Sequence, residues 1–528
     1  MNPSVTDKLR RLLPLLAALL CVMAVSLHFC LWKSGMFIDE IYTYGLANSH
    51  EMPFLGGRID DTMGEQLLTR EDLFDYVAVT GQEDSFDLVS VYTNQVKDVH
   101  PPLHYWIINL VSSLVPGQFS KWIGLIPDLI IYLSSLVLLW LLCVELFENR
   151  WIAVSVLLLY GMSHVGLSTM LMIRMYVLLT FFTVLLALLA AKELREPKLT
   201  REIAIGVCIF LGLLTQYYFV FYAFFLCAFI VLRGFARKEW KSSLRFALCA
   251  FAGVGLMLVC FPAAITQLTA DRLVSGTNAM ENLENLGAWP ARLRYYFGQI
   301  RRGIPAACLV GALAMLAAVP AQFFKKREFR TFFQGSGRCI FLILPAILTV
   351  FVAAVIAPVV EGRYIYNVMP VFTLAAGLCL FLLVKNISKQ SLPWFSLAVL
   401  ALAFGIALRD VPEYIYDEHR DYNTIVAEHA DAPCVYFTGY YAPVTQDLIQ
   451  LLAFDDVFVT EDPASPALAE YLRERDSEEI MVYVDVSGFW GSGFDAQEMI
   501  ARLLDEADYT DAEPAYDYGL SSTWLLSR

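Results

Sequence analysis

The chain has 528 residues, of which 58% are hydrophobic and 17% are charged, and its formal net charge is −14. Its mean hydropathy is +0.56. A water-soluble core cannot bury so large an apolar fraction, so the composition excludes an ordinary soluble protein and predicts an integral membrane protein.

Eleven apolar runs of roughly 15 to 23 residues follow one another along the chain, each near the length that crosses a ~30 Å hydrocarbon core. We expect spans near residues 12–32, 122–144, 151–171, 176–191, 203–216, 218–232, 246–264, 304–321, 339–357, 366–384 and 393–408. The first run follows basic residues, but it is too long for a signal peptide and lacks a small-x-small cleavage site. It therefore predicts an anchor that is retained.

Basic residues gather in three short loops, at 192–201, 233–245 and 325–338. Such loops are typically cytoplasmic. All three alternate correctly with a cytoplasmic N-terminus, and eleven spans then place the C-terminus outside. The large extracytoplasmic parts would be 33–121, 265–303 and the tail from 409 onward.

Adjacent carboxylates occur in "MFIDEIYTYG", where Asp39 and Glu40 follow the first span. A carboxylate near hydrocarbon has its ionised form disfavoured unless it finds a partner, which raises its basicity toward the range useful for proton abstraction. The alternative is an interfacial acidic pair that marks the end of a helix.

The stretch "KDVHPPLHYW" at 97–106 places Lys97, Asp98 and His100 before two prolines. The prolines favour extended residues before them and suit the first turn of a helix. That helix, at 102–115, is too short to cross the membrane, because about 13 residues at ~1.5 Å each reach only about 20 Å. We expect an interfacial or re-entrant helix with the three polar side chains at its mouth.

Two arginines interrupt the apolar sequence at predicted outer boundaries. Arg174 lies between the third and fourth spans, and Arg363 lies with Glu361 and Tyr364 in "PVVEGRYIYNVMP" between the ninth and tenth. A single arginine there is usually a snorkelling side chain. Together with Asp39 and His100 on one side, the arginines suggest planar donors for a phosphate.

The tail from 409 to 528 has a different composition, with six Arg, no Lys, twenty-six Asp plus Glu and a net charge of −20. Strand patterns in "CVYFT", "VFVT" and "IMVYVDV" alternate with helical segments in "APVTQDLIQLLAF" at 442–454, "SPALAEYLRERD" and "DAQEMIARLLDEA". This order predicts a small α/β layer with parallel pairing. It has no Gly-rich phosphate loop and no His/Cys/Asp cluster. We interpret it as a soluble acidic accessory domain.

In these features the chain resembles polytopic glycosyltransferases of the GT-C type, in the group of protein O-mannosyltransferases and aminoarabinose transferases. The resemblance depends on "DE" at 39 and 40, "HPPLHYW" at 100–106, Arg174, and "RY" at 363 and 364. It covers about residues 1–408. It implies a mainly α membrane domain at 1–408, including the first outer loop 33–121 with interfacial helices. The α/β domain at 409–528 lies outside the resemblance and is predicted from its own pattern.

The resemblance also implies a polyprenyl-phosphate sugar donor, a hydroxyl acceptor, inversion at the anomeric carbon, and Asp39 as general base beside Glu40. His100, Arg174, Arg363 and Tyr364 would then bind the donor phosphate, because a glycosyl phosphate needs its leaving group stabilised.

Lys97 and Asp98 are further candidates for a substrate or metal contact. The aminoarabinose branch has a lysine before the two prolines, preceded by a glutamate, where this chain has Val99 and His100, so the substrate and metal of that branch are not carried over. Asp98 and His100 lack a third ligand, and the metal is left open.

Two other functions compete with sugar transfer. A transporter or flippase of lipid-linked saccharides would also have many spans, but it would be expected to place charges or broken helices near mid-membrane, often in two related halves. A scaffold that presents the acidic tail would leave Asp39 dispensable. The sequence predicts a multi-pass cell-membrane transferase with an extracytoplasmic site, and it does not identify the sugar or the acceptor.

Overall fold

The structure is a computed structural model that describes residues 5–56, 62–269, 279–324, 333–385, 391–488 and 493–528. The chain divides into two compact units, and each is built from two segments. Unit 1 comprises Met1–Trp32 and Leu125–Ile415, and unit 2 comprises Lys33–Gly124 and Tyr416–Arg528.

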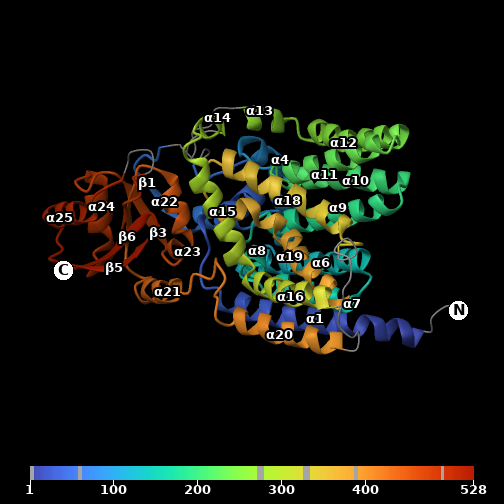
Figure 1. Cartoon of the computed structure of the whole chain (residues 1–528). Helices are drawn as coiled ribbons and strands as arrows, with labels where there is room; N and C mark the ends of the chain where they lie inside the picture. Colours follow the sequence, from blue (N-terminus) through green and yellow to red (C-terminus); the bar gives the residue numbers. More distant parts are fainter. Residues whose placement is uncertain (1–4, 57–61, 270–278, 325–332, 386–390, 489–492) are drawn as a thin grey trace. The chain divides into compact units, whose positions relative to one another are not determined.

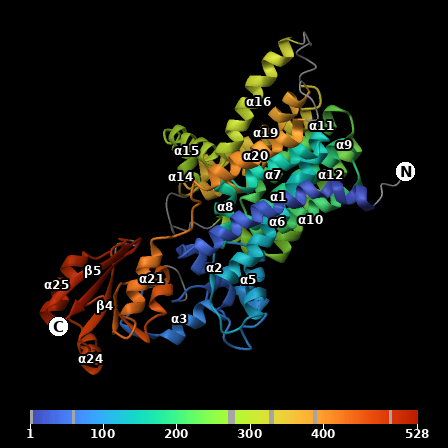
Figure 2. The same cartoon turned by 90° about the horizontal axis from the view of Figure 1, so that it is seen from below.

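Unit 1 is a bundle of apolar helices, and its long helices run alongside one another (Figures 1 and 2). Its elements are α1 (Val5–Trp32), α6 (Lys121–Phe147), α7 (Arg150–Gly161), α8 (His164–Leu171), α9 (Tyr176–Arg195), α10 (Leu199–Thr215), α11 (Phe219–Ala236), α12 (Trp240–Cys260), α13 (Ala263–Thr269), α14 (Ala279–Glu284), α15 (Trp289–Gly303), α16 (Pro305–Phe324), α18 (Gly337–Ile356), the 3-10 helix η1 (Gly362–Val368), α19 (Met369–Val384) and α20 (Leu392–Ala407).

Each of the eleven predicted runs coincides with one of these helices or, for α7 and α8, with a bent pair. Among the described residues, eight helices are long and apolar enough to cross a membrane, or nine if the α7–α8 pair, bent by 60°, is one span. α10 and α20, with 17 and 16 residues, are shorter than these spanning helices. The multi-pass helical class is confirmed, and the number eleven and the orientation stay predictions.

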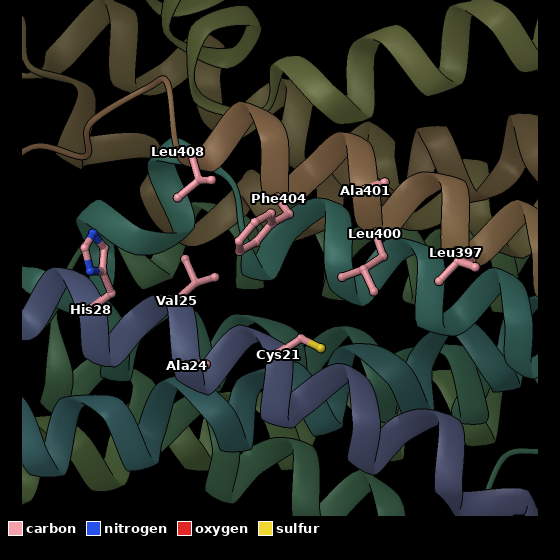
Figure 3. Close-up of a pocket in the computed structure, with 9 residues that line it drawn as sticks. All are labelled: Cys21, Ala24, Val25, His28, Leu397, Leu400, Ala401, Phe404 and Leu408. Carbon is pink, nitrogen blue, oxygen red and sulfur yellow. The ribbon is translucent and has the colours of Figure 1, made fainter.

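In unit 1, α1 and α20 both pack against α7 and leave a groove between them. Figure 3 shows side chains of α1 and α20 facing each other across it. The groove has a volume of about 580 Å³, and its lining is apolar except for His28 and the thiol of Cys21. Apolar surface of this kind is expected on helices that face lipid.

Unit 2 combines short helices with one six-stranded sheet. Its elements are α2 (Ile38–Asn48), β1 (Gln66–Thr69), α3 (Arg70–Val77), α4 (Leu88–Lys97), α5 (Leu103–Ser113), α21 (His419–Glu428), β2 (Cys434–Phe437), α22 (Tyr441–Gln446), α23 (Leu448–Leu451), β3 (Asp456–Thr460), α24 (Pro466–Arg475), β4 (Glu479–Asp485), α25 (Ala496–Glu506), β5 (Asp511–Tyr518) and β6 (Ser521–Ser527).

The sheet has the strand order β1-β3-β2-β4-β6-β5. Its three central strands are parallel, so that Cys434 on β2 pairs with Val457 on one side and with Met481 on the other. These are the three strands predicted from the tail, and α24 and α25 form where helices were expected (Figure 1). The predicted helix near 442–454 is split into α22 and α23 at Asp447.

The sheet also contains a strand from the first inter-span segment. β1 pairs antiparallel with β3, with Gln66 opposite Val459. Arg70 at the start of α3 then donates its Nε–H to the carbonyl of Phe454, at 3.0 Å. Residues 33–124 and the tail therefore fold as one compact unit, whereas the sequence predicted that the first loop would go with the membrane helices.

Candidate active site

The first turn of α2 carries the two adjacent carboxylates. Phe37 precedes the helix in an extended conformation, and its backbone N–H donates to Glu40 Oε2 at 2.7 Å. Glu40 Oε2 also lies 3.0 Å from Lys33 Nζ, and both side chains are 0% exposed. Glu40 therefore holds the beginning of α2 in place, while Asp39 is only half-buried.

The turn before α2 is enclosed by residues of the tail. The ammonium of Lys33 lies 5.4 Å from the ring centre of Tyr416, and Asn423 donates its side-chain N–H to the carbonyl of Ser34 at 3.2 Å. Burial, with Lys33 adding to it, lowers the pKa of His419 to about 4. A neutral His419 adds no positive charge beside the Lys33 ion pair. The tail residues Tyr416, His419 and Asn423 therefore support the turn that carries Asp39.

Lys97, Asp98 and His100 lie at the turn between α4 and α5. His100 Nδ1 is 2.8 Å from Asp98 Oδ2, so the buried aspartate fixes the orientation of the imidazole. Lys97 is exposed, and its ammonium donates to the carbonyl of Glu51 at 3.0 Å. The predicted short helix is present as α5, with 11 residues, and it begins directly after the two prolines.

Arg174 lies in unit 1, in the break between α8 and α9. Its backbone N–H donates to the carbonyl of Met172 at 2.7 Å, and the residue is only 4% exposed. A guanidinium cannot be deprotonated in a protein, so this break holds a permanent positive charge among apolar helices.

Arg363 and Tyr364 stand in the first turn of η1. Arg363 forms an ion pair with Glu361, and its guanidinium lies 6.0 Å from the ring centre of Tyr364. The ring of Tyr364 stacks on that of Tyr218, with centres 4.9 Å apart. The predicted "RY" pair is therefore held in an aromatic environment with its charge partly neutralised.

Sequence reasoning missed the tyrosines around this pair. Tyr176, at the start of α9 and two residues after Arg174, lies with its ring 6.4 Å from that of Tyr366. Tyr414 is close enough to Glu413 and Arg363 for their charges to act on it; burial, reinforced by Glu413, raises its pKa well above the ordinary value. In the sequence these tyrosines are far apart, and no spacing pattern indicates that they meet.

The predicted residues fall into two groups that the structure assembles separately. Asp39, Glu40, Lys97, Asp98 and His100 belong to unit 2. Arg174, Arg363 and Tyr364 belong to unit 1. Within the described ranges, no three metal-ligating side chains gather in one place.

Residues 99–265 match the family model described as dolichyl-phosphate-mannose-protein mannosyltransferase. No curated protein sequence matches the chain significantly.

Solved structures also match, among them two of ArnT and one of an archaeal oligosaccharyltransferase. ArnT from Cupriavidus metallidurans bound to undecaprenyl phosphate matches with a TM-score of 0.51 and 10% identity, over 99% of this chain and 98% of that chain. The same protein in the apo state matches with a TM-score of 0.50 and 11% identity, over 92% and 95%. The Archaeoglobus fulgidus oligosaccharyltransferase tethered with an acceptor peptide matches with a TM-score of 0.45 and 12% identity, over 90% and 69%.

The architecture defines a multi-pass membrane protein of GT-C fold, because the ArnT likeness extends over nearly the whole of both chains. The family match lies in the segment that contains "HPPLHYW" and Arg174. The GT-C fold and the multi-pass membrane class predicted from the sequence are thus confirmed.

Proposed function

We propose that the protein transfers a sugar from a polyprenyl-phosphate-linked donor to an acceptor hydroxyl on the extracytoplasmic side of the membrane, with inversion at the anomeric carbon. The observation that carries this proposal is the division of the carboxylate pair on α2. Glu40 is fully buried and accepts from Lys33 and from Phe37 N–H. Asp39 is the half-buried member and acts as the base.

In this reaction the acceptor oxygen forms a bond to the anomeric carbon while the bond from that carbon to the phosphate oxygen breaks. Asp39 takes the hydroxyl proton, and the polyprenyl phosphate leaves with the electron pair of the broken bond. A base within hydrogen-bond reach of the acceptor typically contributes about 10²–10⁴-fold to the rate. Glu40 contributes indirectly, because it fixes the turn that presents Asp39.

Arg174, Arg363 and Tyr364 of unit 1 bind the leaving phosphate, and His100 is a further candidate for a hydrogen bond to a phosphate. Arginines suit this task because their planar donors match phosphate oxygens. The match to a mannosyltransferase family named for dolichyl phosphate, and to an ArnT bound to undecaprenyl phosphate, supports a donor of this class. Asp98 orients His100, and Lys97, whose ammonium also donates to the carbonyl of Glu51, is a candidate for a substrate contact.

The base is tested with purified protein in liposomes and radiolabelled polyprenyl-phosphate sugars. Asp39→Asn should lower sugar release and transfer by about 10²-fold or more, because asparagine cannot take the proton. Asp75→Asn changes an exposed aspartate on α3 of the same unit and should behave as wild type. Full activity in Asp39→Asn would exclude this mechanism, and movement of donor lipid without bond cleavage would favour a flippase.

The phosphate site is tested by donor kinetics in Arg174→Ala and Arg363→Ala. Each variant should lower kcat/KM for the donor by about 10²-fold or more, since one electrostatic donor at a developing charge is commonly worth that much. Arg237→Ala, in the loop after α11, is the control. If both variants keep wild-type donor kinetics while folding normally, the donor phosphate binds elsewhere.

A further inference from the structure

Unit 1 contains a polar pocket that the proposed mechanism does not use. It has a volume of about 520 Å³ and lies where α15 ends and α16 begins, next to the first residue of α8 and the segment after α20. Six polar side chains line this α15 pocket: His164, Gln299, Arg301, Arg302, Asp410 and Glu413. The volume is within the ~300–1,000 Å³ that is usual for small-molecule sites.

The carboxylates of the α15 pocket are held in place yet remain accessible. Asp410 Oδ1 lies 3.3 Å from His164 Nδ1, and Glu413 Oε1 lies 3.8 Å from His164 Nε2. Glu413 Oε2 also accepts from the hydroxyl of Tyr366 at 2.6 Å, and its backbone N–H donates to Ser168 Oγ at 2.9 Å. The Asp410 and Glu413 side chains are nevertheless 43% and 46% exposed, so oxygen atoms remain available to a ligand.

Arg301 and Arg302 bring two positive charges to the same pocket. Both are exposed residues in the last turn of α15, and in the described part of the chain neither forms an ion pair. Gln299 connects this turn to η1, because a Cβ added at Gly362 would come within 3.3 Å of its Oε1. The α15 pocket therefore adjoins the element that carries Arg363, and its arginines are a separate pair from the proposed donor-phosphate arginines.

These groups fit a ligand with hydroxyls and an anionic substituent. Carboxylates accept hydrogen bonds from hydroxyls, an amide both donates and accepts, and guanidinium groups bind phosphate or carboxylate through paired donors. Peptide sites more often use an open sheet edge or an apolar groove, and this lining offers fixed charges of both signs. The donor's own phosphate is already assigned to Arg174 and Arg363.

We propose that the α15 pocket binds the acceptor, and that the acceptor is a saccharide bearing a phosphate or carboxylate. Asp410 and Glu413 accept from its hydroxyls, and Arg301 and Arg302 bind its anionic group. Assigning this ligand as the acceptor depends on the proposed function, which places the donor phosphate at the other arginines.

Binding to the full chain in detergent tests the pocket without any turnover. The probes are glucose 6-phosphate, glucuronate, glucose and a Ser/Thr-containing peptide, titrated by calorimetry. Both anionic sugars should bind. The Arg301→Ala/Arg302→Ala double variant should raise the Kd of each by about tenfold or more, because charge-assisted hydrogen bonds are lost. Asp410→Asn should weaken the binding of glucose 6-phosphate, because the carboxylate that accepts from the sugar hydroxyls is lost. Arg294→Ala, on the same helix but outside the pocket, should leave binding unchanged.

A competition separates acceptor from donor. Undecaprenyl phosphate should not displace glucose 6-phosphate if the two anions have separate sites, and displacement would overturn the assignment as acceptor site. Binding of the peptide alone, or anionic-sugar binding that survives the double variant in a folded protein, would overturn the pocket proposal itself. Wild-type protein that binds the sugars but never cleaves a donor would refute only the proposed function.

Discussion

The ion pair between Lys33 and Glu40 shows what a single residue contributes at the site. Both side chains are fully buried, and such pairs rarely add much net stability because both charges lose water. Removing one partner is costly, typically about 3–5 kcal/mol, since a buried charge is left without compensation. The pair is therefore better understood as a device that fixes the geometry of the turn before Asp39.

The sequence showed that the carboxylate pair was unusual but could not assign its members. Position alone made Asp39 and Glu40 equivalent candidates. What distinguishes them is Lys33, seven residues away, and the tail residue Tyr416 that covers it. An interaction that needs a partner from the far end of the chain leaves no local pattern, so only the tertiary structure separates the base from its support.

Asp447 provides a pH test at a single residue. Burial raises its pKa to about 7, against an ordinary value of 3.8, even though Tyr436 donates to it. The folded protein thus holds a proton that the unfolded chain releases between about pH 4 and 7. Stability should therefore fall as pH rises through this window and level off above it, by up to about 4 kcal/mol at ~1.4 kcal/mol per pKa unit.

Thermal unfolding at pH 5 and pH 8 measures this effect. Asp447→Asn should have a smaller drop in Tm between the two pH values than wild type, because asparagine stays neutral. Asp431→Asn, at an exposed site in the same unit, should follow wild type. An unchanged pH slope in Asp447→Asn would show that this carboxyl is ionised in the folded protein.

At the scale of elements, α10 and α12 approach each other more closely than side chains would allow. A Cβ added at Gly253 would lie 2.2 Å from the carbonyl oxygen of Gly206, and one added at Gly206 would lie 2.5 Å from that of Cys249. Small residues permit such backbone contact in membrane helix pairs. Gly253→Ala should therefore separate the helices and cost about 1–3 kcal/mol, as overpacking commonly does.

The matched control lies two residues further along the same helix. Gly255 has nothing within 4 Å of an added Cβ, so Gly255→Ala should be neutral or slightly stabilising through its better helix propensity. Thermal stability in detergent compares the two variants. Equal stability of both would mean that the two helices pack less closely than described.

Elements were predictable where a local pattern sufficed. Apolar runs long enough to cross a bilayer identified the helices of unit 1. The buried strands β2, β3 and β4 were predictable because each is a continuous apolar stretch. β1, β5 and β6 were missed. β1 has four residues, and β5 includes Pro514 and several acidic residues. Neither sequence therefore has the apolar pattern of a strand, and only pairing with a neighbouring strand identifies it.

At the scale of the whole molecule, both units are made of segments distant in sequence. Truncation after Ile415 should therefore abolish sugar transfer rather than remove a dispensable accessory, since Tyr416, His419 and Asn423 enclose the turn before α2. Activity in liposomes measures this outcome. A truncated protein with wild-type activity would show that the tail is independent of the base.

A single substitution distinguishes loss of support for the turn from misfolding of the truncated chain. Asn423→Ala removes the hydrogen bond to Ser34 and should lower kcat by several-fold while the protein remains folded. Thr424→Ala, at the exposed neighbouring position, should keep wild-type kcat. Identical kcat in both variants would place the support of the turn elsewhere.

The pairing of β1 with β3 also sets an order of events during synthesis. Arg70 emerges from the ribosome 384 residues before its partner Phe454, so the strand beside it waits unpaired while the intervening helices are made. Such distant pairings form slowly and leave a strand edge exposed to wrong partners. The short, four-residue length of β1 limits that hazard. The turn that presents the carboxylate pair is likewise enclosed only after Tyr416 and Asn423 have been made.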